Sequence, residues 1–335
     1  MTRLARRIQQ AQAADAARFD PEQHFLELAL RGRTARKARA HLRRMEPVVV
    51  FTPRWSGVGR FMEELALDLA VGEPAVGCRT VGFQALQGRP LAECWQFVHH
   101  LFAQLGQRGW TPPAPTSIAD RRGFQWAIEQ ALEDAHREAP HRVALLAHGA
   151  EFLPVELLED MTNAWRDYAE RHADARRATL LLAGSASAPW LHIGDAPRVE
   201  LADFGEAEAA AAIVGQAGPV PVRHLEQVAR FSGGVPAAVE RLGAAARTSG
   251  GLPTRREDLV AALGPLGDEM RGAVDIVAAH DHLADRLQDL LSGEPLPLAR
   301  EVDEPLVMAG LARTVRTPAG DATALRAPAI ATLVG

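Results

Sequence analysis

The stretch VVVFTPRWSGVGRFMEEL, residues 48–65, has the layout of a phosphate-binding loop. An apolar run leads into a glycine-containing turn, and the turn leads into apolar residues at helical spacing. Such a loop binds an anion because backbone N–H groups and a helix N-terminus point at it. A lysine adds positive charge for the β- and γ-phosphates, and a Ser or Thr hydroxyl holds magnesium. The chemistry to look for is therefore binding of ATP or ADP and magnesium-dependent hydrolysis.

The signature GxxxxGK[ST] fits this stretch in two registers, and both lack groups that the chemistry needs. In the preferred register Arg54 occupies the position of the first glycine and Gly59 that of the second. Arg60 then occupies the lysine position and Phe61 the position of the Ser or Thr. This register aligns SGVGRF with the form SGVGKT and keeps a cation after the glycine. Arginine is bulkier than lysine and planar, so it does not occupy the loop as a compact charge. The chain has one lysine, Lys37, which lies upstream of the strand.

The second register places Thr52, Gly57, Val58 and Gly59 in the same four roles. Neither register leaves a hydroxyl for magnesium, so we expect no hydrolytic metal site. An anion cradle made by the backbone is still expected, and the alternative is a glycine turn that binds nothing. The expected nucleotide contacts are Ser56, Gly57, Val58, Gly59, Arg60, Phe61, Ser185 and Pro236.

A second buried strand, VALLAHGAEFLP at 143–154, is where a nucleotide hydrolase of this layout carries its magnesium aspartate. His148 stands at that position, and Glu151 is the nearest carboxylate. The only candidates for catalysis are therefore Glu151 and His148. We expect His148 to make hydrogen bonds rather than to bind a metal, because no His, Cys or Asp stands at ligand spacing from it. Ser185, at the tip of the strand 178–185, is either a polar sensor of the γ-phosphate or a turn-capping serine.

Length, net charge and cysteine spacing limit the kinds of protein that this chain can be. The chain has 335 residues, enough for two or three domains, and a net charge of −5, which excludes binding of a polyanion by bulk attraction. Residues 1–46 are net basic and the rest is net acidic, which favours docking of the basic segment on its own chain over a nucleic-acid or acidic partner. Cys78 and Cys94 have no CxxC spacing, and no apolar run approaches the roughly 18 residues of a membrane span. A cytoplasmic protein with no membrane association is predicted.

Strands and helices alternate along residues 47–201, which predicts an α/β fold with a parallel sheet and helices on both faces. Helices are expected at 2–17 and about 20–43, and a loop at 111–117. The segment CRTVGFQAL, 78–86, is predicted as one strand.

Residues 204–246 are predicted to form short helices around a glycine-rich joint, followed by a linker at 247–254. Residues 255–292 are predicted helical, and ARTVRTPAGDATALRA, 312–327, is predicted to form a hairpin. Helices followed by such a hairpin suggest a winged helix.

Four segments in order resemble AAA+ and STAND-type P-loop ATPases. LALRGRTARKARAHL at 28–42 resembles the entry box, residues 48–65 the Walker A segment, ALLAHGAEF at 144–152 the Walker B pattern, and FSGGVPAAVERL at 231–242 the GxP motif of the helical lid. In the Walker B pattern, His148 stands for the first aspartate, Glu151 for the second acidic position and Phe152 for the glutamate. In the GxP motif the matching residues are Gly234, Val235 and Pro236.

The resemblance implies a nucleotide between an α/β domain and a helical lid, with a winged helix after the lid. It predicts an N-terminal helical segment at 1–24, a degenerate P-loop NTPase-like α/β domain at 25–202, a helical lid at 203–250 and a winged-helix-like domain at 255–335. It also implies assembly into rings or other homo-oligomers and, as a family association, a role in bacterial conflict systems.

The leading hypothesis is a degenerate ATPase-like subunit that regulates or scaffolds through protein contacts. Its partner would be an active ATPase or an effector, and ATP or ADP would bind weakly or not at all. The first alternative is a slow ATPase switch that uses Arg60 in place of lysine and Glu151 as its carboxylate.

The second alternative is a DNA-associated regulator or loader. The candidate recognition helix, LAREVDEPLVMAGL at 298–311, sets Arg300 against Glu301, Asp303 and Glu304, so it favours protein docking over phosphate contact. The basic stretch Arg31–Arg44 is either a nucleic-acid contact or, preferably, a solvated helix face.

Overall fold

The structure, a computed structural model, describes residues 31–105, 118, 120–138, 142–173, 176–185, 195–218 and 221–334. It divides into two compact units: Met1–Thr52 with Val58–Glu200, and Pro53–Gly57 with Leu201–Gly335. The helix predicted at 2–17, the segment 1–24 and the loop predicted at 111–117 lie outside the described residues.

The first unit is built on a five-stranded sheet in the order β2-β3-β4-β1-β5, with every neighbouring pair parallel. The three inner strands are almost wholly buried, as continuous apolar runs require when both faces of a sheet are covered. The strands are β1 Val48–Phe51, β2 Gly77–Gly82, β3 Val143–His148, β4 Ala178–Gly184 and β5 Arg198–Glu200.

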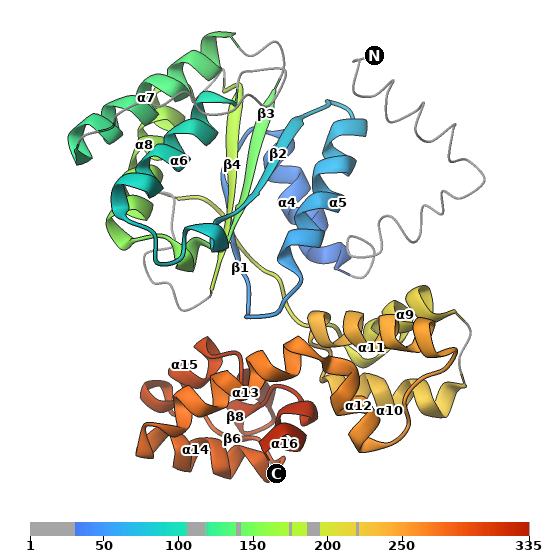
Figure 1. The fold of residues 1–335 in the computed structure, drawn as a ribbon. Coiled ribbons are helices and arrows are strands. Elements are labelled where there is room, and N and C mark those ends of the chain that lie inside the picture. Colours follow the sequence, from blue (N-terminus) through green and yellow to red (C-terminus); the bar gives the residue numbers. More distant parts are fainter. Residues whose placement is uncertain are drawn as a thin grey trace. The chain divides into compact units, whose positions relative to one another are not determined.

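Helices cover both faces of this sheet, so the predicted α/β fold class is confirmed (Figure 1). One face carries α4 and α5, and the other carries α6, α7 and α8. Their bounds are α4 Gly32–Arg43, α5 Val58–Val71, α6 Leu91–Ala103, α7 Arg121–Glu138 and α8 Val155–Arg171, with short 3-10 helices η1 Phe83–Leu86 and η2 Ala150–Phe152.

The prediction of one strand over 78–86 was wrong in its second half. The strand β2 ends at Gly82, and Phe83–Leu86 form the 3-10 turn η1. In a 3-10 helix residues three apart lie above one another. The turn therefore buries Phe83 and Leu86 together in the core of the first unit, which an extended strand with alternating faces does not do.

The second unit contains three helices that pack on one another, α9 Glu206–Ala217, α10 Val222–Ser232 and α11 Pro236–Ser249. They are followed by α12 Arg256–Leu263, α13 Pro265–Ala278 and α14 Asp281–Leu291. The chain then forms β6 Leu296–Pro297, α15 Arg300–Met308, β7 Ala312–Thr317, β8 Gly320–Leu325 and α16 Pro328–Val334. The three strands form an antiparallel sheet in the order β6-β8-β7, so the hairpin predicted at 312–327 is confirmed.

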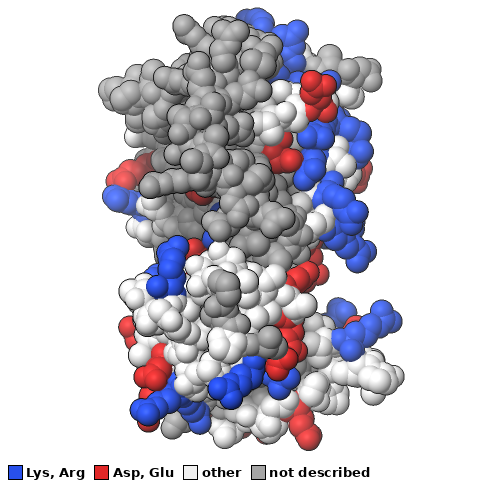
Figure 2. Space-filling model, turned by 90° about the vertical axis from the view of Figure 1, so that its right-hand side faces the viewer, with Lys and Arg blue, Asp and Glu red and all other residues white. Residues whose placement is uncertain are grey.

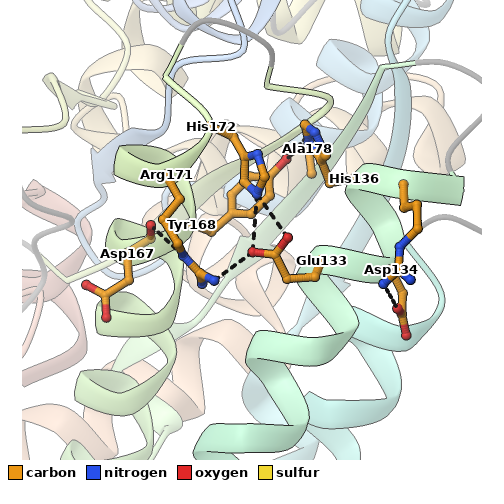
Figure 3. A network of polar contacts seen from close by, with 9 residues as sticks. Glu133, Asp134, His136, Asp167, Tyr168, Arg171, His172 and Ala178 are labelled. Carbon is orange, nitrogen blue, oxygen red and sulfur yellow. Dashed lines mark hydrogen bonds and ion pairs between the residues drawn. The ribbon is translucent and has the colours of Figure 1, made fainter.

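Helices α7 and α8 of the first unit are joined by a network of polar side chains (Figure 3). The His136 and His172 rings stack with centroids 3.8 Å apart. His172 Nε2 lies 3.0 Å from a carboxylate oxygen of Glu133, which also pairs with Arg171. The Tyr168 hydroxyl lies 3.1 Å from His136 Nδ1 and accepts a hydrogen bond from the backbone N–H of Ala178, the first residue of β4. The network thus ties the helix layer to the start of a central strand.

We predict that this network makes the first unit sensitive to acid. Burial lowers the pKa of His136. The nearby His172 and Arg177 lower this pKa further, whereas Glu133 raises it. A histidine whose pKa is lower in the folded state than in the unfolded state stabilises the fold. This contribution is complete above the pKa of the unfolded state, about 6.5, and it is lost as the pH falls through the pKa of the folded state. Melting temperature should therefore drop between pH 7 and pH 5, and more shallowly in His136→Gln.

The matched control is His282→Gln, at an exposed histidine of α14. It should keep the slope of the wild type. Equal slopes for wild type and His136→Gln would show that His136 does not carry the effect.

Candidate functional site

The chain leaves the sheet of the first unit at a fixed point after β1. The backbone N–H and the hydroxyl of Thr52 both donate to the carbonyl oxygen of Gly184, at 2.8 and 3.2 Å. Thr52 is buried, and Gly184 is the last residue of β4. The carboxyl ends of β1 and β4 are therefore locked together where a phosphate loop begins.

Helix α5 begins at Val58, so Gly59, Arg60 and Phe61 lie in its first turn. The guanidinium of Arg60 lies 3.4 Å from the carboxylate of Glu64, one turn further along, and the Glu64 side chain is only 6% exposed. The phenyl ring of Phe61 is fully buried. The position expected to carry a magnesium hydroxyl therefore holds a core side chain.

His148, at the carboxyl end of β3, packs between two glycines of the first unit. A Cβ placed on Gly59 would lie 3.5 Å from His148 Nε2, and one on Gly82 would lie 2.6 Å from His148 Cε1. The other ring nitrogen, Nδ1, is 3.3 Å from the Gln84 side-chain amide nitrogen. Burial lowers the pKa of His148, partly opposed by Glu63. The structure thus brings Gly59 and His148 together, with a neutral imidazole at the strand end near neutral pH.

Glu151 lies in η2, and its carboxylate accepts a hydrogen bond of 3.2 Å from the backbone N–H of Ser185. The preceding Gly149 has φ +77°, a left-handed conformation that lets the chain turn sharply after β3. The two predicted residues Glu151 and Ser185 are therefore neighbours at the carboxyl end of β4, linked through the backbone N–H of Ser185.

The loop residues Pro53–Gly57 belong to the second unit. Ser56 is buried, and Gly57 has φ +67°, as a tight turn requires. Trp55 also has a positive φ, +58°, which is uncommon for a bulky residue and costs about 1 kcal/mol or more. Such a conformation persists only where neighbouring groups determine it.

The neighbours of Trp55 include three groups from helices and the C-terminal part of the second unit. The Trp55 carbonyl accepts a hydrogen bond of 3.1 Å from the N–H of Ala237, in the first turn of α11. The indole N–H donates to Glu269 of α13 over 3.1 Å. The Arg326 guanidinium lies 6.0 Å from the ring centroid, within range of a cation–π contact. The loop is thus built into the helices of the second unit.

The GxP turn next to this contact is closely enclosed. Gly233 and Gly234 both have positive φ, and a Cβ on Gly234 would clash with the Phe204 carbonyl. Pro236 is the buried first residue of α11, where its fixed φ suits a helix start. Arg326 makes a bidentate pair with Asp203 at 2.7 and 2.8 Å.

The candidate recognition helix is observed as α15, and one of its acids does not face solvent. Asp303 is buried and binds Arg286 through both oxygens, at 2.7 and 2.9 Å. It also accepts from the Ala299 N–H and the Thr323 hydroxyl. Burial opposes its ionisation, but these hydrogen bonds hold its pKa below the usual range. Counting Asp303 as a surface charge was wrong, because it is neutralised inside the unit.

Trp55, Glu269 and Gln84 were not among the residues predicted from the sequence. The only sequence signal for Trp55 was a large aromatic inside a glycine turn. Within the described ranges, no group of three or more His, Cys, Asp or Glu side chains is arranged to hold a metal ion.

Comparison with solved structures gives the fold. A Walker-type ATPase of Pyrococcus abyssi superposes with a TM-score of 0.63, covering 91% of this chain and 95% of that chain at 12% identity. The chain has the fold of a Walker-type P-loop ATPase. The P-loop ATPase part of the predicted resemblance is therefore confirmed as a likeness of fold, which does not by itself carry an activity.

Two further structures superpose less well. A STAND protein with a tetratricopeptide repeat sensor from Pyrococcus horikoshii has a TM-score of 0.43 and 11% identity, covering 89% of this chain and 41% of that one. Thermotoga maritima RuvB has a TM-score of 0.43 and 14% identity, covering 88% and 90%. No family model and no curated protein matches the chain. Of the helices described, none has the length and apolar character needed to cross a membrane.

The packing of His148 predicts a sharp difference between two glycines of β2. Gly82→Ala should cost about 1–3 kcal/mol, because the new methyl group displaces both the Gln84 side chain and the His148 ring. Gly77→Ala is the matched control, since its nearest neighbour would be 3.6 Å away, an ordinary contact. Urea denaturation measures both, and equal stability of the two variants would contradict the packing described.

The contacts of Trp55 predict graded losses in the second unit. Trp55→Ala should cost about 2 kcal/mol, since it removes the ring and the indole donor. Trp55→Phe should cost about 1 kcal/mol, because it removes the donor and keeps most of the ring. Denaturant unfolding followed by far-UV circular dichroism measures both. A Trp55→Ala variant as stable as the wild type would refute the role assigned to the ring.

Proposed function

We propose that the chain is an ATPase-like subunit that regulates or scaffolds through protein contacts and does not hydrolyse ATP. The observation that carries this proposal is the pair of groups at the two magnesium positions. One is the fully buried Phe61 ring and the other is His148, whose pKa is lowered by burial.

Magnesium requires oxygen ligands, and it accepts carboxylates, hydroxyls and water in octahedral geometry. A phenyl ring supplies no ligand, and an imidazole is a poor substitute for a carboxylate at this ion. Glu151 is a carboxylate nearby, yet one of its oxygens already accepts from the Ser185 N–H. The residues present therefore do not fit a P-loop magnesium site, and no step is assigned to the metal.

Phosphate binding is weakened for a separate reason. The Arg60 guanidinium points along α5 toward Glu64 rather than standing as an isolated cation. A phosphate cradle needs backbone N–H groups that face the anion, whereas Trp55 presents a carbonyl that is used by Ala237. ATP or ADP is expected to bind weakly or not at all.

The second unit supports a docking role. We assign residues 203–250 to a helical lid and 255–335 to a winged-helix-like domain, after an α/β domain at 25–202. On α15 the exposed charged residues are Arg300, Glu301 and Glu304. Two carboxylates against one guanidinium disfavour a phosphate backbone and suit a protein surface. The partner class proposed is an active ATPase or an effector in the cytoplasm, with self-assembly as the alternative.

A slow ATPase switch is the second candidate. The position of Glu151 favours it, because its carboxylate lies at the carboxyl end of β4, held by Ser185. In that case Glu151 would act as the general base and Arg60 would replace the lysine.

We predict no magnesium-dependent release of phosphate from ATP above the background of buffer. Release is measured with the wild type, Glu151→Gln and, as a matched control, Glu156→Gln at an exposed acid of α8. Turnover that is lost in Glu151→Gln and kept in Glu156→Gln would reject the proposal and establish the slow ATPase.

A further inference from the structure

The solvent side of α4 in the first unit is a continuous basic surface. Arg33, Arg36 and Lys37 are exposed, while Ala35, Ala38 and Leu42 are buried on the opposite side. The helix Gly32–Arg43 contains no acidic residue. Arg33 and Lys37 are one turn apart, about 6 Å along the axis. We call Arg33, Arg36 and Lys37 the α4 basic face.

The charges of this face are not consumed by acids of the same unit. Other basic residues of the segment are paired: Arg39 lies 2.8 Å from Asp68, and Arg44 lies 2.8 Å from Glu46, whose pKa falls to about 2, chiefly through its hydrogen bond with Arg44. Among the described residues, no carboxylate pairs with Arg33, Arg36 or Lys37, and Arg36 donates only to the carbonyl of Gly32. Within the described part of the chain, the α4 basic face therefore has no acidic partner.

The positive surface continues past the end of α4. Arg142, which precedes β3 and is exposed, donates from its guanidinium to the carbonyl of Arg43 over 2.9 Å. Arg177 is also exposed, and its carbonyl accepts from the N–H of Val143, beside Arg142. Figure 2 shows Lys and Arg along one margin of the view, with some Asp and Glu between them. Exposed basic residues therefore continue beyond α4, at Arg142 and Arg177.

The chemistry of this surface suits nucleic-acid phosphates better than a protein. Protein interfaces depend on buried aromatic or apolar anchors, and none of the exposed large apolar side chains of the described chain lies on α4. Binding of single strands relies on aromatic side chains that stack on bases, and α4 carries no Phe, Tyr or Trp, while its His41 is bound to Glu46. Guanidinium groups match phosphate through paired hydrogen bonds. The helical spacing of about 6 Å is close to the rise of two nucleotides, about 7 Å.

We propose that the α4 basic face binds the phosphate backbone of a nucleic-acid duplex without reading its sequence. This activity goes beyond the proposed regulatory role and is independent of the phosphate loop. It depends on charge alone, so affinity should fall steeply with salt.

The test measures binding of a fluorescein-labelled DNA duplex of mixed sequence by the full chain, across a range of salt concentrations. One variant that carries all three substitutions, Arg33→Gln, Arg36→Gln and Lys37→Gln, neutralises the face. It should bind the duplex at least tenfold more weakly at low salt. The slope of log K against log salt should become shallower by about 0.9 for each phosphate that the variant no longer neutralises. Glutamine keeps high helix propensity, and circular dichroism checks that α4 remains folded.

The control neutralises three exposed arginines of the second unit, Arg241→Gln, Arg247→Gln and Arg256→Gln, for the same change in net charge. It should bind duplex as the wild type does. Equal weakening in both variants, or no retention of duplex by the wild type at about 50 mM salt, would overturn the proposal. Retention of polyglutamate without retention of duplex would overturn it in favour of an acidic protein partner.

Discussion

The contact of the His148 ring with Gly59 and Gly82 governs what the carboxyl edge of the sheet can do. Parallel strand order brings the ends of β1, β3 and β4 to one edge, where a P-loop ATPase places its ligands. Here the half-buried ring of His148, whose pKa burial lowers, lies at that edge. A neutral imidazole can pack against two glycines, whereas an aspartate would need a cation or further donors to offset its burial. The packing of His148 therefore supports the proposal that the chain has no hydrolytic magnesium site.

The loop after β1 is likewise held by contacts within the chain, here in the second unit. Trp55 adopts a left-handed conformation, and hydrogen bonds to its carbonyl and indole N–H stabilise it. These interactions give the loop hydrogen-bond partners within the chain. Elsewhere in that unit the buried Asp303 fixes Arg286, the start of α15 and Thr323 of β8 at once. These contacts of the second unit use polar groups to hold local structure.

The sequence predicted the parts of the fold that depend on local pattern. The apolar runs became β1, β3 and β4 close to their expected bounds, because a strand covered on both faces has to be apolar throughout. It also identified His148, since strand ends are easy to locate. It missed the role of Trp55, because Glu269 lies 214 residues away and no local rule pairs them. The prediction that Asp303 is a surface charge was wrong, because which side of a helix is buried depends on the elements that pack against it.

The most direct test is calorimetric titration of the wild type with ATP and with ADP, each with and without magnesium. We expect heats no larger than those of dilution, or weak binding that magnesium does not strengthen, because Phe61 and His148 supply no oxygen ligand at the two magnesium positions. Micromolar binding that tightens with magnesium and disappears in Arg60→Ala would contradict it. Such a result would mean that the stretch at 48–65 still binds phosphate through its helix N-terminus and Arg60, and that the chain responds to nucleotide.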